Sequence, residues 1–438
     1  MNKLMLFIIL ILSFTAKSQI TPPAGIGSNI ILWLSPDTSV FESPGIPALV
    51  GDRVEEWHDI SGGGYVFKTS STTKEPTFAT YQNNNYLDFI DGRFLENTAV
   101  ASIINGLDEF SIYMVIKSDD VNTDQGFLDS ENSDGADDIL CIRYDASGAN
   151  TARTNLLKCG MQGNIANNQV ESQSNTQTNQ KQVLTLTWKA GEKINLYLDG
   201  VLNSSSNNTI ATPMSGIQKI LIGKGPKDIG VNSGWDGKIG TTIFYSKKMD
   251  PDTVSLISTD LLSTNSVKTG DWNDPTTWDC NCNPINNASV TINDLHTVTL
   301  TQNETIGNVI IKSGGNLDLS TNNFRLNVQK NFTNNGSLTS REGKIKFTGS
   351  IEQLINGSGN TNFYNLHINN NAGVRTTDGN LNVLKSLYIQ KGCFDTGDRL
   401  TLVSNTIGTA RIAELSGTAC VNGDITMQRY VGSESANW

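Results

Sequence analysis

Apolar and polar residues alternate along several short segments in the first half of the chain. Apolar side chains occupy every second position in residues 110–116, 183–188 and 194–199. A period of two places these side chains on one face of a β-strand, so each segment is predicted to be a strand with one buried face. Residues 189–192 separate the last two strands, and Gly191 supplies the backbone freedom that a tight reversal needs. We therefore predict an antiparallel hairpin here and a β-sandwich overall, because long loops connect the other segments.

The second half of the chain consists of short apolar triplets separated by Gly and Asn. Residues 326–332 align with residues 381–387 at an offset of 55. A shorter unit begins at Asn308, Asn365 and Ser386, and the last two lie 21 residues apart. Short strands and polar turns that repeat about every 20 residues predict a parallel β-helix or solenoid, with inward Val, Ile and Leu stacked between coils and ladders of Asn. A disordered polar linker is the alternative, but it would not keep apolar residues and Gly at matched offsets.

Composition agrees with an all-β chain of more than one domain. The chain has 438 residues, of which 37% are hydrophobic, 17% are charged and 7% are aromatic. This length predicts two or three domains, and 40 glycines disfavour a helical bundle. We predict an antiparallel β-sandwich of the jelly-roll type over residues 19–263. A parallel β-helix or solenoid follows over residues 264–438.

The N-terminus has the pattern of a secretory signal peptide. Lys3 precedes an apolar run, and the small residues Ala16 and Ser18 follow it, which predicts cleavage after Ser18 and a signal peptide over residues 1–18. No later run approaches the ~18 to 20 apolar residues of a membrane-spanning helix. We expect a secreted or outer cell-surface protein. The formal net charge of −11 makes nucleic acid and anionic membrane surfaces poor partners.

The six cysteines fit an oxidising compartment. Neighbours along the chain give three candidate disulfides: Cys141 with Cys159, Cys280 with Cys282, and Cys393 with Cys420. The pairing stays open, because six cysteines permit many connectivities, and buried thiols are an alternative. Zinc is the rival interpretation. It is less favoured because no Cys-x-x-Cys occurs and the histidines are scattered, at His58, His296 and His367.

Residues 184–201 resemble the hairpin of laminin-G-like domains of the concanavalin A-like lectin/glucanase superfamily, in which a Leu-Tyr-x-Asp-Gly turn is typical. Here that turn ends at Asp199 and Gly200. Other segments are similar to the opening strands, closing strands and terminal short helix of the same domain. They are residues 31–34, 57–62, 220–223, 235–245 and 249–254. The resemblance implies a jelly roll that binds extracellular glycan.

The second region resembles the β-helical repeats of bacterial surface proteins that the type IX route exports. Residues 270–278, followed by Cys280 and Cys282, carry the resemblance most clearly, and residues 345–357 extend it. The resemblance implies export machinery of that route as a partner. Such proteins continue into a C-terminal sorting domain, whereas this sequence stops at Trp438, so a truncated reading frame is expected.

Paired catalytic carboxylates are not evident in the sequence. Laminarinase-like members of the superfamily carry Glu-x-Asp-x-(x)-Glu on one strand, and we find no such motif and predict no catalytic residue. The nearest acidic cluster is predicted to be a loop, and its oxygen ligands would suit calcium, although the spacing matches no EF-hand. A solvated acidic loop is the alternative. The cluster comprises Asp129, Glu131, Asp134, Asp137 and Asp138.

Tryptophan rings could provide flat faces on which sugars stack. Trp33 and Trp188 lie in apolar strands and are predicted to be buried. Trp235 and Asp236 lie in a Gly-rich turn and are the candidate ligand-binding residues, with a structural role as the alternative. Neighbours on a strand point to opposite faces, so His58 and the residue after it are not a catalytic pair.

Three functional classes remain. We favour a non-catalytic carbohydrate-binding or adhesion protein whose sandwich holds an extracellular glycan or surface polysaccharide and whose solenoid is a stiff spacer. A glycosidase or lyase would need two positioned carboxylates or a base. A purely structural surface protein would bind no sugar. Calcium is the one cofactor that the sequence suggests.

Overall fold

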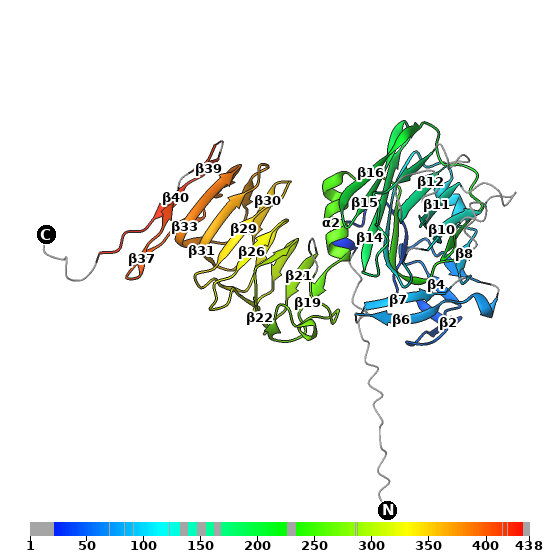
Figure 1. The fold of residues 1–438 in the computed structure, drawn as a ribbon, viewed down its shortest axis with the longest axis horizontal. Coiled ribbons are helices and arrows are strands. Elements are labelled where there is room, and N and C mark those ends of the chain that lie inside the picture. The colour runs from blue at the N-terminus through cyan, green and yellow to red at the C-terminus, as the bar shows by residue number, and fades with distance from the viewer. Residues whose placement is uncertain are drawn as a thin grey trace, which may run out of the picture.

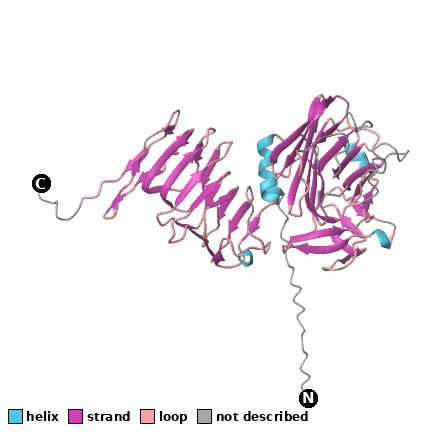
Figure 2. Cartoon of the chain, in the orientation of Figure 1, coloured by secondary structure: helices cyan, strands magenta, loops and turns pink. Residues whose placement is uncertain are grey.

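The computed structural model describes residues 22–431 except residues 70, 83, 91, 122, 132–138, 147–154, 162–167, 226–233, 285, 287, 414 and 418. It contains the predicted all-β fold, in which an antiparallel sandwich is followed by a parallel solenoid (Figures 1 and 2). Helix α2 (Pro251–Leu261) lies between the two domains (Figure 1). The remaining helical elements are α1 (Ala101–Ile104), η1 (Pro23–Gly25), η2 (Thr72–Lys74) and η3 (Pro275–Thr277).

The sandwich consists of two antiparallel sheets packed face to face. In spatial order the first sheet contains β16 (Val201–Ile210), β15 (Glu192–Leu198), β14 (Gln182–Lys189), β9 (Glu109–Ser118), β18 (Gly237–Tyr245), β7 (Asn84–Phe89) and β6 (Thr77–Tyr81), and β1 (Ile30–Leu34) also pairs with β18. The second sheet contains β13 (Gln169–Glu171), β12 (Leu156–Met161), β11 (Leu140–Asp145), β10 (Gln125–Glu131), β17 (Lys219–Ile222), β8 (Leu95–Asn97), β5 (Val66–Lys68), β4 (Glu56–His58), β2 (Val40–Ser43) and β3 (Ile46–Pro47). One hydrophobic core fills the space between them.

The predicted strands are present, but the expectation of a single buried face is wrong for the central ones. Every residue from 110 to 116 in β9 is buried. Ile112 and Met114 belong to the core between the sheets, whereas Tyr113 and Val115 belong to a second core on the opposite face. A strand covered on both sides needs apolar residues on both sides. The predicted hairpin joins β14 to β15, with Gly191 at φ +83°.

The second core joins the sandwich to the solenoid through α2. Asp250 caps the helix by accepting a hydrogen bond from the N–H of Thr253 at 2.9 Å. Val254 and Ile257 are fully buried in a cluster that extends from the outer face of the first sheet into the solenoid. Lys330 of the solenoid donates a hydrogen bond to Ser255 of the helix. The two domains therefore share apolar packing.

The solenoid stacks parallel strands in three sheets. The first contains β19 (Thr264–Asn265), β21 (Ser289–Ile292), β24 (Asn308–Ile311), β27 (Phe332–Asn334), β30 (Gln353–Asn356), β32 (Val374–Thr376), β34 (Cys393–Asp395) and β39 (Cys420–Asn422). The second contains β20 (Gly270–Asp271), β22 (Thr297–Thr299), β25 (Asn316–Asp318) and β28 (Ser337–Thr339). The third contains β23 (Glu304–Ile306), β26 (Arg325–Val328), β29 (Lys344–Phe347), β31 (Thr361–Asn369), β33 (Leu381–Lys391), β35 (Leu400–Leu402) and β40 (Ile425–Met427), with β38 (Arg411–Ile412) beside β33. A short hairpin joins β36 (Ser404–Asn405) to β37 (Gly408–Thr409).

The strand register separates the true repeat from a false one. Asn365 pairs with Ser386, so these two members of the shorter unit lie on successive coils. Its third member is wrong, because Asn308 begins β24 of the first solenoid sheet. The 55-residue alignment is wrong, because it equates Phe332, on β27 of the first solenoid sheet, with Leu387, on β33 of the third. The predicted Asn ladders form: the Asn382 amide, for example, donates to the side chain of Asn362 at 2.8 Å.

Two of the three candidate disulfides form, Cys280–Cys282 and Cys393–Cys420. The third pair is corrected: Cys141 and Cys159 lie buried on β11 and β12 as thiols. Cys141 is opposite Gly160, and Cys159 is opposite Ile142. Residues one position out of register point to opposite faces of the sheet, so these two sulfur atoms cannot meet. Among the residues that the structure describes, no helix is long and apolar enough to cross a membrane.

Candidate functional site

Two open pockets that share Lys181 lie where the first sandwich sheet meets α2 and the start of the solenoid, and we call them together the junction groove. One pocket has a volume of about 180 Å³ and the other about 230 Å³. The smaller pocket is lined by Pro36, Asp37, Asn84, Asn85, Tyr86, Val115, Lys181, Gly240, Thr241, Asp260, Leu261 and Ser263. The larger is lined by Gln82, Gln180, Lys181, Leu262, Thr264, Cys280, Cys282 and Asn283. Lys181 belongs to both.

The polar side of the groove comes from the loop after β1 and from the start of β7. The Asn85 amide donates to the exposed Asp37 carboxylate at 3.1 Å, and the Asn84 amide donates to the backbone carbonyl of Gln82 at 2.9 Å. Tyr86 is buried beneath them. Burial, with the negative charge of Asp37, raises the pKa of Tyr86, so its hydroxyl stays protonated. Amide, carboxylate and hydroxyl groups therefore converge on one small cavity.

Lys181 is the cation of the groove and immediately precedes β14. Burial lowers the pKa of Lys181 to about 8, although Asp279, Asp37 and Asp199 act in the opposite direction. Its ammonium is therefore easier to deprotonate than that of an exposed lysine, and both its forms exist near pH 8. In its charged form an ammonium group has three N–H donors and no acceptor.

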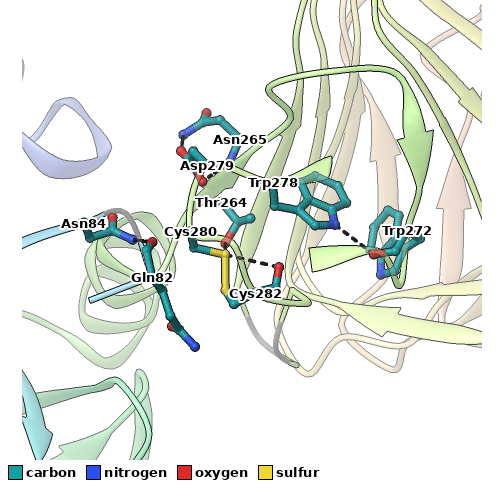
Figure 3. Close-up of a disulfide and its surroundings, with 9 residues drawn as sticks. All are labelled: Gln82, Asn84, Thr264, Asn265, Trp272, Trp278, Asp279, Cys280 and Cys282. Carbon is teal, nitrogen blue, oxygen red and sulfur yellow. Dashed lines mark hydrogen bonds between the residues drawn. A yellow bond between two sulfur atoms is a disulfide. The ribbon is translucent and has the colours of Figure 1, made fainter. Parts of the chain in front are cut away.

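The solenoid wall of the groove contains the first disulfide, Cys280–Cys282 (Figure 3). Asp279, one residue before it, accepts hydrogen bonds from the backbone and the side chain of Asn265 at 2.9 and 2.7 Å. Trp278 donates from its indole N–H to the backbone carbonyl of Trp272 at 2.8 Å. Figure 3 shows Gln82 facing this wall from the sandwich side. Residues of both domains therefore line the groove.

Trp235 does not provide a sugar-stacking face, which corrects the prediction made from its Gly-rich turn. The ring is fully buried in the sandwich core. It lies edge-on to Phe127 with centroids 4.9 Å apart and is stacked on Tyr144 at 6.1 Å. A ring enclosed by β10 and β11 has no surface left for a ligand. Trp33 and Trp188 are buried as predicted.

Asp236 lies in a partly exposed cluster of carboxylates and lysines. Its backbone carbonyl accepts the N–H of Asp119 at 3.0 Å. Burial, followed by nearby carboxylates that include Asp119, raises the pKa of Asp236. Burial also opposes ionisation of Asp119, but hydrogen bonds from Lys117 and Lys238 outweigh it and hold the pKa of Asp119 below its ordinary value. The ligand-binding role assigned to Asp236 stays a prediction.

The acidic cluster predicted as a calcium loop begins on a strand. Asp129 is buried within β10 and Glu131 ends that strand, so the loop prediction is wrong for these two residues. Asp134, Asp137 and Asp138 lie outside the described residues. Within the described residues, no three His, Cys, Asp or Glu side chains lie close enough to hold a metal ion.

The outer face of the second sheet carries a buried ionic network that the sequence did not predict. Lys158 lies 2.6 Å from Asp145 and 3.5 Å from Glu171, and Arg143 lies 3.7 Å from Asp145. The available signal was the alternation of charged with apolar residues along β11. The sequence could not show that β12 and β13 supply the partner charges, because strand pairing is set by long-range contacts.

His58 does not act with Asp59. Its Nε2 lies 2.8 Å from the Glu56 carboxylate, whereas Asp59 accepts the backbone N–H groups of Trp33 and Ser61 at 2.8 and 2.9 Å. Asp59 therefore organises a turn.

A family model of known proteins matches part of the chain, and the matched part lies in the sandwich and the start of α2. Residues 95–255 match the family model of the concanavalin A-like lectin/glucanases superfamily. This match extends from β8 to the first turn of α2 and agrees with the resemblance carried by the hairpin. No curated protein sequence matches the chain.

Solved structures with similar folds are distant in sequence. Trypanosoma rangeli sialidase is 12% identical with a TM-score of 0.37, and the match covers 53% of this chain and 33% of the sialidase. The botulinum neurotoxin serotype D ligand binding domain in complex with N-acetylneuraminic acid is 16% identical with a TM-score of 0.39, covering 56% of this chain and 54% of that domain. This chain thus spans a third to about half of the length of these proteins.

Proposed function

We propose that the protein is a secreted or cell-surface carbohydrate-binding protein that holds a glycan in the junction groove and performs no catalysis. The observation that carries the proposal is the convergence of Asp37, Asn84, Asn85 and Lys181 on one cavity at the end of α2. Sugar hydroxyls both donate and accept hydrogen bonds, and this set of side chains offers both partners. The match of the sandwich to the lectin/glucanase superfamily supports the same class of ligand.

The rest of the chain fits this proposal. The solenoid would act as a stiff spacer, because its coils stack one on another through continuous parallel pairing. The signal-peptide pattern of residues 1–18 would bring the protein to the outside of the cell, and the type IX route is the proposed path of export.

A glycan array with the purified full chain tests the proposal, followed by titration calorimetry with the best glycan. Replacing Asn85→Ala or Asp37→Ala should weaken that glycan roughly tenfold, because each variant removes one polar partner of a bound hydroxyl. Asp108→Ala is the matched control, since Asp108 is also exposed but does not line the groove. Its affinity should stay within about twofold of the wild type.

Three outcomes would contradict the proposal. A blank array would favour a structural protein. Equal affinity for wild type, Asn85→Ala and Asp37→Ala would place the glycan elsewhere. Release of reducing or unsaturated sugar from a bound polysaccharide would show catalysis.

A glycosidase is the second candidate, and the pair Asp119 and Asp236 favours it. Their pKa values are moved in opposite directions, as in sites where one carboxyl group acts as an acid and another as a base. The hydrogen bonds from Lys117 and Lys238 to Asp119 argue against a free nucleophile. Loss of sugar release in Asp236→Asn would support this candidate.

A further inference from the structure

The outward face of the third solenoid sheet carries a group of basic side chains, which we call the cationic face: Arg325, Lys344, Lys346 and Lys391. Leu326 and Ile345 alternate with the outward residues and point into the solenoid core. Strands β26, β29, β31 and β33 run side by side in this sheet (Figure 1).

The strand register sets the basic residues in rows along the solenoid axis. Arg325 pairs with Lys344 on the next coil, and Asn327 pairs with Lys346. Lys346 in turn pairs with His367, and His367 with Tyr388. Neighbouring coils of a parallel sheet lie ~4.8 Å apart, so each row presents a polar or charged group at every such step.

The charges that act on Lys346 at this face are positive. After burial, the influences that lower the pKa of Lys346 are the charges of Arg325, Lys344 and Lys391, and no carboxylate opposes them. Within the described residues, Arg325, Lys344 and Lys346 form no ion pair. Because the chain has a net charge of −11, its average composition predicts a negative surface, and this face differs from that expectation.

Two aromatic rings continue the row that contains Lys346. The rings of His367 and Tyr388 are stacked with centroids 4.3 Å apart and planes inclined by 28°. Tyr388 is partly exposed, whereas His367 is buried and its Nε2 has no hydrogen-bond partner among the described residues. Sugar rings pack against exposed aromatic faces of this kind.

We propose that the cationic face binds an acidic polysaccharide whose repeating unit carries a carboxylate or a sulfate. Such a chain would run along the solenoid axis and place its acidic groups against successive coils. The site is separate from the junction groove and does not depend on it.

Charge density favours an acidic polysaccharide over nucleic acid. Duplex DNA carries one negative charge per ~1.7 Å, and proteins that bind it are usually basic overall. Four basic residues on a chain of net charge −11 offer too little attraction to offset that repulsion. A polysaccharide with one acidic group on each repeating unit has more widely spaced charges, and these suit a short row of cations.

The test measures binding of the full chain to polygalacturonate, chondroitin sulfate, neutral dextran and duplex DNA at about 50 mM and about 200 mM salt. The wild type should bind one or both acidic polysaccharides, more weakly at the higher salt, and should not bind dextran. The double variant Lys344→Gln and Lys346→Gln should weaken binding roughly tenfold. Arg325→Gln, on a different strand, should weaken it in the same direction.

The control removes two charges elsewhere on the solenoid, with Lys268→Gln and Lys312→Gln. Both control residues are exposed and lie off the cationic face. The proposal is overturned if the wild type binds neither acidic polysaccharide, if the control loses as much affinity as the double variant, or if duplex DNA binds more tightly than both. Unchanged binding in both Lys344→Gln with Lys346→Gln and Arg325→Gln also overturns it. Circular dichroism and thermal unfolding of each variant verify that it is folded.

Discussion

At the scale of single residues, His367 shows how packing fixes a protonation state. The side chain is 7% exposed and stacked on Tyr388. Burial, followed by the positive charges of Lys344, Lys346 and Arg325, lowers the pKa of His367 from 6.5 to about 4. The folded protein therefore keeps a neutral imidazole over a pH range in which the unfolded chain takes up a proton.

This shift predicts a specific loss of stability in acid. The folded pKa is depressed, so the contribution is complete above pH 6.5 and is lost as the pH falls to about 4. The loss should reach about 1 to 3 kcal/mol. Urea unfolding followed by circular dichroism at pH 7 and at about pH 4.5 measures it. His367→Gln should lose less stability than the wild type over that interval, and equal losses would contradict the assignment.

The local sequence correctly predicts the role of a residue whose contacts are local. It fails for a residue whose burial depends on strands that are distant in the sequence. Asp199 was expected to support a turn, and it does: it adopts a positive φ and accepts the N–H of Val183 at 2.8 Å. Trp235 was expected at a surface because its neighbours are glycines. Phe127 and Tyr144, which are distant in sequence, enclose its ring. The sequence of the Gly-rich turn therefore could not predict that Trp235 is buried.

At the scale of elements, the alternation of apolar and polar residues predicted where the strands lie. It did not predict which of their faces are covered by other elements. Residues 110–116 alternate as a half-buried strand would, yet Tyr113 and Val115 are also buried, in the second core that includes residues of α2. Similarly, the 21-residue repeat could be read from the apolar spacing, since coils stack directly. The 55-residue similarity was misleading. Leu381 and Leu387 both lie on the long strand β33, whereas residues 326 and 332 lie on β26 and β27, which belong to different sheets.

The two disulfides should differ in what they contribute to stability. Cys280 and Cys282 are separated by 2 positions, whereas Cys393 and Cys420 are separated by 27 and join β34 to β39 on adjacent coils. Closing a longer loop removes more entropy from the unfolded chain, which gives roughly 3 to 4 kcal/mol for the long loop and roughly 1 to 2 kcal/mol for the short one.

Double Ser variants at each pair test this difference. Replacing Cys393 and Cys420 should raise amide hydrogen exchange in β34 and β39 strongly, whereas replacing Cys280 and Cys282 should have a smaller effect on β19 and β21. The reverse order would show that loop length does not govern these bridges.

At the scale of the whole molecule, the two domains are joined by packing rather than by a free linker. Leu262, which follows α2, and Thr264, which begins β19, are both buried, so no exposed segment separates sandwich from solenoid. The sequence indicated a change of texture near this point. It could not indicate a shared core, because the apolar residues of α2 would also suit a helix that covers the sandwich alone.

The shared core predicts that a cavity in α2 weakens both domains. Ile257 is fully buried in the cluster that spans them, whereas Leu256 on the same helix is 38% exposed. Ile257→Ala should cost about 2 to 4 kcal/mol and raise amide hydrogen exchange on both sides, in β14 of the sandwich and β21 of the solenoid. Leu256→Ala, the matched control, should leave both strands nearly unchanged. If Ile257→Ala affected only β14, the solenoid would be an independent folding unit, and the walls of the junction groove would be free to move apart.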